Sequence, residues 1–110
     1  MELWGSGKPR REFLHVDDLA KCVLFAAEKT LNYPLYNVGS GVDFTIQELA
    51  TMVSKIVGYS GTIVWNTSKP DGTPRKLLDT TKINEAGWND EIKLEEGITG
   101  TYQWFKKHYS

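Results

Sequence analysis

One stretch of the sequence is too apolar to form a helix with an ordinary solvent-facing side. We predict a helix over residues 17–29, in which most positions are apolar: Leu19, Ala20, Cys22, Val23, Leu24, Phe25, Ala26 and Ala27. A helix with almost no polar face is normally buried on more than one side. A chain of 110 residues can build only one modest core, so we do not expect it to bury this helix by itself.

The remaining predicted elements are short strands that alternate with helices. This order favours an α/β or α+β fold over an all-α bundle, with residues 1–110 in a single domain. We predict strands over 11–16, 36–38 and 61–65, a helix between Thr45 and Gly58, an exposed loop over 69–76, a helical turn over 80–86 and a final helix over 94–107.

The helix that begins near Thr45 has the clearest boundaries. Thr45 and Glu48 have the spacing of a capping box, in which each side chain satisfies a free backbone amide of the first turn. Apolar residues then recur on one side of the helix, and Gly58 is typical of a helix end. We therefore expect an ordinary amphipathic helix here.

Composition excludes several classes of partner. The formal net charge is −1, which provides no field to attract a polyanion, so we expect no nucleic-acid partner. No run reaches the ~18 apolar residues of a membrane span, and residues 1–5 lack the layout of a signal peptide. We therefore expect a cytoplasmic protein that does not enter a membrane.

Two glycine pairs invite a dinucleotide-binding interpretation. Gly5-Ser6-Gly7 and Gly39-Ser40-Gly41 both lack the third glycine of the fingerprint, and the first pair leads into a strand rather than a helix. Plain turns explain both segments better. We therefore assign no cofactor-binding residue.

Metal-binding and acid-base residues are equally sparse. His15, His108 and Cys22 do not have the spacing of metal ligands, and the apolar neighbours of Cys22 indicate a packed thiol rather than a reactive one. Asp17 and Asp18 are better explained as favourable charges at a helix start than as a catalytic pair. We assign no catalytic and no metal-binding residue.

Two polar segments combine cations with an aromatic ring or a carboxylate. Lys8, Arg10 and Arg11 follow Trp4, and Lys69, Arg75 and Lys76 surround Asp71. Guanidinium and ammonium groups bind phosphate oxygens, and a carboxylate accepts hydrogen bonds from ribose or a base. These segments could bind a sugar nucleotide, although charged loops of this kind are often only solvated.

Longer motifs resemble a known family over essentially the whole chain. Trp4-Gly5-Ser6-Gly7, the run 11–18 (Arg-Glu-Phe-Leu-His-Val-Asp-Asp) and Tyr36-Asn37-Val38-Gly39 resemble the second half of extended short-chain dehydrogenase/reductases that act on nucleotide sugars. The runs 68–79, 87–88 and 101–105 are similar to the GDP-L-fucose synthases in particular. The resemblance implies an α/β carboxyl-terminal substrate domain without its Rossmann core.

The resemblance also implies an activity for the parent polypeptide. Enzymes of this family use NADP(H) to epimerise and reduce GDP-4-keto-6-deoxy-D-mannose to GDP-L-fucose. Matched position by position, Trp4, Arg11, Asp71 and Lys76 are expected to contact the GDP-sugar substrate. The family's catalytic and NADP-binding residues lie in the missing amino-terminal Rossmann domain, so we expect this chain alone to bind no cofactor and to be inactive.

Each of these four residues also has a simpler interpretation. Trp4 could be a core aromatic residue, Arg11 could pair with Glu12 or Asp17, Asp71 could shape an Asp-Gly turn, and Lys76 could be solvated.

The resemblance offers a partner for the apolar helix. Residues 17–38 are expected to pack on the absent cofactor domain or on another copy of the chain, so self-association is expected of the fragment. The corresponding part of a UDP- or dTDP-sugar epimerase or dehydratase, and a non-catalytic binding module, remain alternative interpretations.

Overall fold

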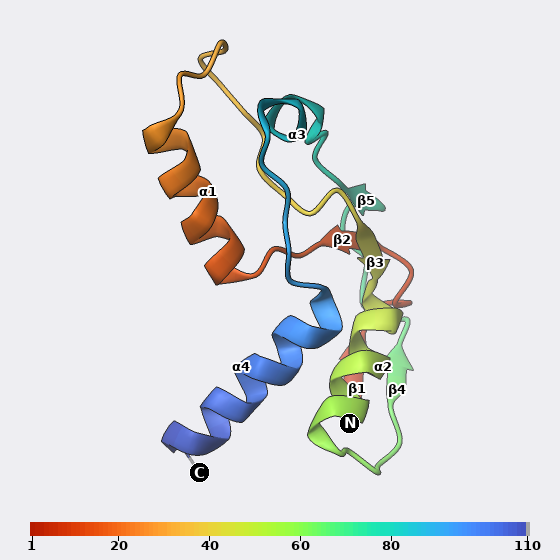
Figure 1. The fold of residues 1–110 in the computed structure, drawn as a ribbon. Coiled ribbons are helices and arrows are strands. Elements are labelled where there is room, and N and C mark those ends of the chain that lie inside the picture. Colours follow the sequence, from red (N-terminus) through yellow and green to blue (C-terminus); the bar gives the residue numbers. More distant parts are fainter. Residues whose placement is uncertain (110) are drawn as a thin grey trace.

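The structure is a computed structural model, and it describes residues 1–109. Within residues 1–109, four helices and five short strands follow one another (Figure 1). Their bounds are β1 Glu2–Trp4, β2 Arg10–Glu12, α1 Val16–Glu28, β3 Asp43–Thr45, α2 Ile46–Val57, β4 Val64–Asn66, β5 Arg75–Lys76, α3 Thr81–Ala86 and α4 Leu94–Tyr109.

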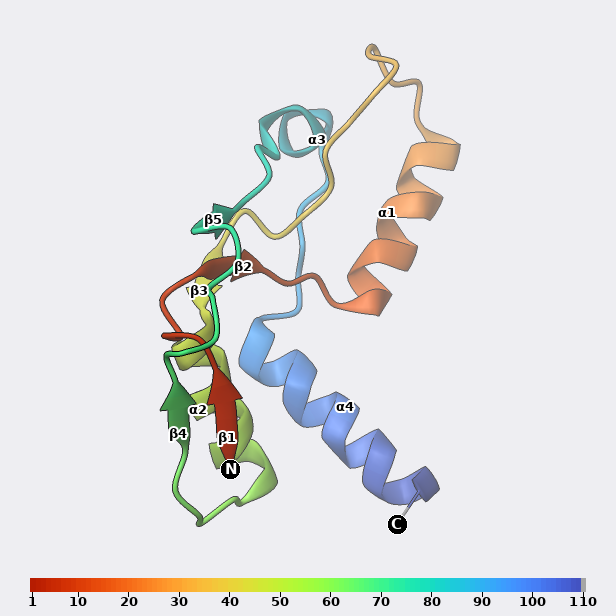
Figure 2. The same cartoon turned by 180° about the vertical axis from the view of Figure 1, so that it is seen from behind.

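The strands form two small sheets. Strand β1 pairs in parallel with β4, and β2 lies at the centre of a second sheet with the order β3-β2-β5. In that second sheet β2 is antiparallel to β3 and parallel to β5. The predicted mixed α/β fold is confirmed, and both sheets lie on the same side of the molecule as α2 in the two views (Figures 1 and 2).

The helix starts agree well with the sequence, with one exception in their chemistry. Thr45 and Glu48 form the predicted capping box, and Gly58 ends α2 in the left-handed conformation. Helix α1 is capped by His15, whose ring accepts a hydrogen bond from the backbone N–H of Asp17. Asp17 and Asp18 lie in the first turn of α1, as predicted for acids at a helix start. Asp18 does not cap the helix, however: the residue is 1% exposed and its carboxylate accepts hydrogen bonds from the N–H groups of Glu91 and Ile92.

The predicted strands were less accurate. Residues 36–38 form no strand, and the strand predicted over 11–16 is the three-residue β2. The strand predicted over 61–65 begins later, as β4 at Val64, and the loop predicted over 69–76 ends in β5. Strands this short have too few residues to show an alternating pattern, which explains these errors.

The buried core is small. It consists of Cys22, Ile83 and Trp88, with four partly buried side chains packed around it. Cys22 is 3% exposed, which confirms the packed interpretation of this residue. This burial raises the pKa of the thiol, and a thiol that stays protonated is a poor nucleophile.

The molecule is flat and open rather than compact. Its extents are 50 × 35 × 17 Å and its radius of gyration is 16.8 Å, compared with about 13 Å for a compact domain of this length. Its accessible surface of 7886 Å² exceeds the ~6,200 Å² expected of a compact monomer of this mass. Much apolar surface therefore remains uncovered.

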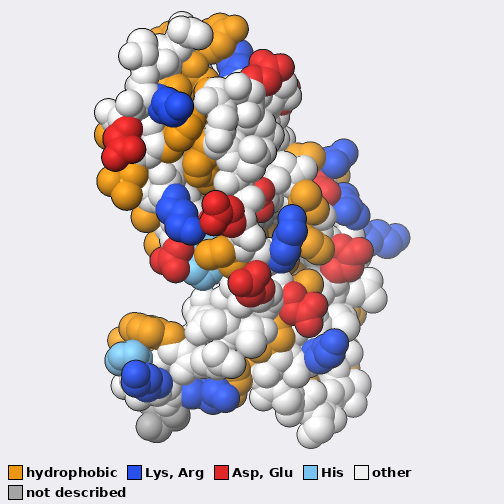
Figure 3. All heavy atoms as spheres, viewed as in Figure 1, with side chains coloured by type: hydrophobic (Ala, Val, Ile, Leu, Met, Phe, Trp, Pro, Cys, Tyr) orange, Lys and Arg blue, Asp and Glu red, His pale blue; other side chains and the backbone are white. Residues whose placement is uncertain are grey.

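Helix α1 carries part of that uncovered surface. Val16, Val23 and Leu24 are 71%, 61% and 62% exposed, and hydrophobic side chains gather over α1 in the space-filling view (Figure 3). The sequence prediction that the chain cannot bury this helix by itself is confirmed.

None of the helices between residues 1 and 109 is both long and apolar enough to cross a bilayer.

Candidate functional site

Trp4 lies at the end of β1 with its ring on the surface. The residue is 69% exposed, so it is not a core aromatic residue. The ammonium group of Lys69 lies 4.9 Å from the ring centroid, which places a cation over a flat aromatic face. A ring with this exposure can stack on a planar ligand group.

Asp71 is fixed by Ser6 across the turn that follows β1. Its two carboxylate oxygens accept hydrogen bonds from the Ser6 backbone N–H, at 2.8 Å, and from the Ser6 hydroxyl, at 2.6 Å. These bonds, first the hydroxyl and then the amide, lower the pKa of Asp71. An ionised carboxylate has about four acceptor positions, so Asp71 keeps capacity for a ligand hydroxyl or amine.

The turn that follows β1 requires glycine at position 5, where the backbone passes close to Asp71. Gly5 has a φ of +86°, and a Cβ at this position would collide with Oδ1 of Asp71. The turn and residues 70–72 are therefore held in close contact.

Arg11, at the centre of β2, extends its side chain to residues 72–73, which directly follow Asp71. Its Nη1 donates hydrogen bonds of 2.7 Å to the carbonyl oxygens of Arg10 and Thr73. A Cβ at Gly72 would lie 3.1 Å from its Nη2. The alternative pairing with Glu12 or Asp17 is not formed in the described part of the chain, where Glu12 accepts hydrogen bonds from Gly41 and Leu78.

Lys76 lies beside Arg11 on the neighbouring strand. The two residues are Cα partners in the parallel pairing of β2 with β5, and paired residues in a sheet present their side chains on the same face. Lys76 is exposed. Two cations are thus presented side by side on one face of the three-stranded sheet.

A small hollow brings three of the four predicted residues together. It has a volume of about 120 Å³ and is lined by Trp4, Arg11 and Asp71 together with Gly7, Pro9, Ile46, Pro70 and Gly72. Lys76 lies outside this lining but next to Arg11. Pockets for small ligands usually measure about 300–1,000 Å³, so the hollow has room for part of a nucleotide sugar.

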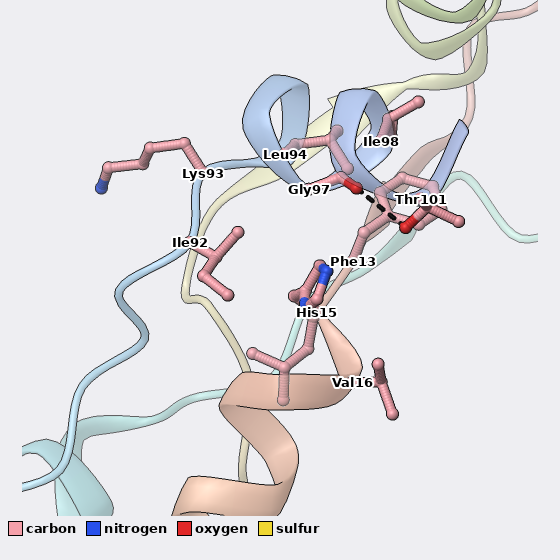
Figure 4. A pocket seen from close by; sticks show the side chains of 10 residues that line it. Phe13, His15, Val16, Ile92, Lys93, Leu94, Gly97, Ile98 and Thr101 are labelled. Atoms are coloured by element: carbon pink, nitrogen blue, oxygen red, sulfur yellow. Dashed lines mark hydrogen bonds between the residues drawn. The ribbon is translucent and has the colours of Figure 1, made fainter. Parts of the chain in front are cut away.

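A larger hollow lies elsewhere, between the starts of α1 and α4. It measures about 300 Å³ and is lined mainly by apolar side chains from Phe13–Val16 and residues 92–101 (Figure 4). The ring of His15 points into it, and its Nδ1 is already used as the helix cap. This hollow offers no cation for phosphate other than Lys93, whose ammonium group points away from it in the close-up view.

The structure gives no fit for a dinucleotide or a metal among residues 1–109. Gly5-Ser6-Gly7 joins β1 to the segment before β2, and Gly39-Ser40-Gly41 precedes β3, so neither pair opens a helix whose amino end could hold a pyrophosphate. No group of three or more metal-ligating side chains is found in that part of the chain.

Sequence analysis missed two residues that shape the site. Ser6 fixes Asp71, and Asp43 joins two of the predicted cations, Arg10 and Arg75, through its carboxylate. Neither role could be predicted from local sequence, because each contact joins segments that lie far apart along the chain.

Comparisons with known proteins agree with the family resemblance that the sequence motifs indicated. Residues 1–39 match the model of the NAD dependent epimerase/dehydratase family. The chain is 52% identical over 112 residues to the GDP-L-fucose synthase of Escherichia coli K12, which covers 94% of this chain and 35% of that protein. The chain spans about a third of the length of the curated relatives it matches.

Two solved structures are similar in fold. The GDP-mannoheptose C4 reductase MlghC from Campylobacter jejuni, with NADP bound, has a TM-score of 0.80 and 42% identity over 96% of this chain and 34% of its own. UDP-glucose 4-epimerase from Thermotoga maritima, with UDP-glucose, has a TM-score of 0.88 and 31% identity over 100% of this chain and 36% of its own. The chain therefore has the fold of one part of the extended short-chain dehydrogenase/reductases.

Proposed function

We propose that this chain is the substrate-binding part of a cytoplasmic, NADP-dependent GDP-L-fucose synthase. The parent enzyme would epimerise GDP-4-keto-6-deoxy-D-mannose and reduce its ketone to give GDP-L-fucose. The 52% identity to a GDP-L-fucose synthase supports this substrate, and the fold shared with an NADP-bound GDP-sugar reductase supports the cofactor.

The observation that carries the proposal is the grouping of Trp4, Arg11 and Asp71 around one hollow, with Lys76 beside Arg11. In this arrangement the Trp4 ring stacks on a planar part of the ligand. Arg11 and Lys76 bind the pyrophosphate, and Asp71 accepts hydrogen bonds from the nucleoside.

The hollow is too small to be a complete nucleotide-sugar site, so the parent enzyme must supply its other wall. A volume of about 120 Å³ falls below the usual range of ligand pockets. The parts of the relatives without a counterpart in this chain would also hold NADP(H), which supplies the hydride for ketone reduction. The residues described here bind and orient the substrate only, and we predict no turnover by the chain alone.

Calorimetric titration with GDP, GDP-mannose and UDP-glucose tests this function. We expect the full-length polypeptide that carries this chain to bind GDP and GDP-mannose selectively. An Arg11→Ala/Lys76→Ala variant should lose this binding. A Lys55→Ala/Lys107→Ala variant is the matched control, because it removes the same charge from α2 and α4 and should bind normally. Equal loss in both variants, or no binding of GDP by the wild type, would contradict the proposal.

A UDP-sugar epimerase is the second candidate. The fold similarity to the UDP-glucose 4-epimerase extends over the whole chain, so the fold is compatible with either base. Preference for UDP-glucose over GDP-mannose in the same titration would favour this candidate. A non-catalytic binding module would bind GDP-mannose in the full-length polypeptide without oxidising NADPH in the presence of the keto-sugar.

We further propose that residues 17–38 pack against the cofactor domain in the parent enzyme and against another copy in the isolated chain. Val16, Leu19, Val23 and Leu24 are exposed on α1, and in the parent enzyme this surface would pack on the cofactor domain. In the isolated chain, another copy would cover it. Sedimentation of the isolated chain should therefore show self-association that a Leu24→Glu variant weakens. A monodisperse wild-type monomer at high concentration would contradict this part of the proposal.

A further inference from the structure

The three-stranded sheet separates its charged residues onto two faces. Successive side chains of a strand point to opposite faces. In the register of β3-β2-β5, Arg10 pairs with Arg75 while Arg11 pairs with Lys76. The Arg10–Arg75 pair therefore lies on one face, and the Arg11–Lys76 pair of the proposed ligand site lies on the other.

Asp43 of β3 joins the two arginines of the first face. Its Oδ1 lies 3.1 Å from Nε of Arg10, and its Oδ2 lies 2.6 Å from Nε of Arg75. Arg10 Nη2 also donates a 3.3 Å hydrogen bond to the Asp43 carbonyl oxygen. The Asp43 side chain is only 6% exposed, whereas the arginine side chains are 40% and 59% exposed. One buried carboxylate thus connects all three strands of the sheet.

Strand β5 depends on this connection because it is so short. It contains only Arg75 and Lys76, and the Arg10 N–H donates a 2.8 Å hydrogen bond to the carbonyl oxygen of Pro74 just before it. A two-residue strand has little backbone pairing to fix its position. The loop that leads into β5 carries the Thr73 carbonyl oxygen, which accepts a hydrogen bond from the Arg11 guanidinium.

We propose that Asp43 is a positioning residue for the proposed nucleotide-sugar site. By holding β5 against β2 from the opposite face of the sheet, Asp43 keeps Lys76 next to Arg11 and keeps the Thr73 carbonyl within reach of the Arg11 guanidinium. This inference rests on the proposed function for its ligand, but the arrangement of Arg11 that it requires can be measured without any ligand.

The direction in which Asp43→Asn changes the GDP affinity distinguishes a positioning role from a purely electrostatic one. An Asp43→Asn variant removes a negative charge near a site for a pyrophosphate, so charge alone would tighten GDP binding. Loss of positioning should instead weaken it, by about tenfold, at the low end of the effect of orienting partners in metal sites. Calorimetry on the full-length polypeptide measures this change, and unchanged or tighter binding of GDP would overturn the proposal.

Asp18→Asn is the matched control for a loss of stability. Asp18 is also a buried aspartate with a structural role, but its hydrogen bonds anchor Glu91 and Ile92 away from the site. We expect this variant to lower the melting temperature and to leave the GDP affinity of the folded protein within about twofold of the wild type, since the site is untouched. Equal weakening in both variants would mean that Asp43 only stabilises the fold.

The Arg11 side chain gives a second test that needs no GDP. Arginine side-chain NMR signals should show a restrained Arg11 guanidinium in the wild type and in Asp18→Asn. In Asp43→Asn we expect Arg11 to shift towards the signal of a solvated arginine. An unchanged Arg11 signal would overturn the positioning role. Failure of the wild type to bind GDP, with the Arg11 shift present, would instead contradict only the proposed ligand.

Discussion

Ser6 donates two hydrogen bonds to the carboxylate of Asp71, one from its backbone N–H and one from its hydroxyl. This pair joins the turn after β1 to the loop before β5, and both segments line the same hollow as Trp4 and Arg11. The residue predicted to bind the ligand therefore also holds two segments of the candidate site together.

The Asp71 contact predicts a pH dependence of stability. The Ser6 hydrogen bonds lower the folded-state pKa of Asp71 below its ordinary value. Their contribution to stability is therefore fully present above the ordinary pKa and is lost as the pH falls through the lowered pKa. We expect the wild type to lose more stability than Asp71→Asn on acidification below about pH 4. Urea unfolding between pH 5 and 2 measures the difference.

Asp90→Asn is the control for this experiment, because it removes an acid from a different part of the chain. The part of the Asp71→Asn effect that Asp90→Asn does not share is then due to the Ser6 contact rather than to the loss of one carboxylate. Parallel curves for the wild type and Asp71→Asn would show that the Ser6 contact does not contribute through ionisation.

Trp4 predicts a separation of binding from stability. Since its side chain is mostly exposed, Trp4→Ala should change the free energy of unfolding by no more than about 0.5 kcal/mol. The same change should weaken GDP-mannose binding about tenfold if the ring stacks on the ligand, and Trp4→Phe should keep most of the affinity because it keeps a flat ring. Calorimetry and urea unfolding on the three proteins give both numbers, and normal binding by Trp4→Ala would remove this residue from the site.

The residues of the candidate site were indicated by motifs in the sequence rather than by spacing. The resemblance indicated Trp4, Arg11, Asp71 and Lys76. The structure brings the first three around one hollow, and Lys76 lies outside its lining, beside Arg11. Ser6 and Asp43 were missed because their roles arise from pairing between strands, and the β2–β5 register could not be predicted when β5 has only two residues. Long-range pairing is what a single sequence does not show.

In the fold as a whole, features set by local sequence were likewise predicted, and features set by long-range contacts were missed. Helix α2 was predicted from its capping box and its terminal Gly58, which are local signals. Asp18 was correctly placed at the start of α1. Its second role was missed because an acid near a helix start suits the helix dipole whether or not a distant segment also hydrogen-bonds to it. Here Glu91 and Ile92 use it, as the segment between α3 and α4 passes the start of α1.

The small core predicts a strong effect at Ile83. Its side chain is 1% exposed and packs with Cys22 and Trp88. Ile83→Ala should lower the free energy of unfolding by about 2–5 kcal/mol, and Ile83→Val by about 0.5–1.5 kcal/mol. Ile56→Val is a matched control on half-exposed α2 and should have a smaller effect. Urea unfolding of the three variants measures the series, and equal effects at the two positions would contradict the assignment of this core.

The capping box at α2 predicts that a threonine-to-alanine substitution lowers stability at the start of the helix but not inside it. The Thr45 hydroxyl accepts a 3.0 Å hydrogen bond from the Glu48 N–H, and the Glu48 carboxylate accepts a 2.8 Å hydrogen bond from the Thr45 N–H. Thr45→Ala should therefore reduce the free energy of unfolding by about 1 kcal/mol. Thr51→Ala makes the same change inside the helix, where alanine is the better helix former, and should be neutral or stabilising. Since α2 packs against α4, circular dichroism during urea unfolding should report the loss as one cooperative shift. A loss of stability in Thr51→Ala as large as that in Thr45→Ala would show that the cap does not set the start of this helix.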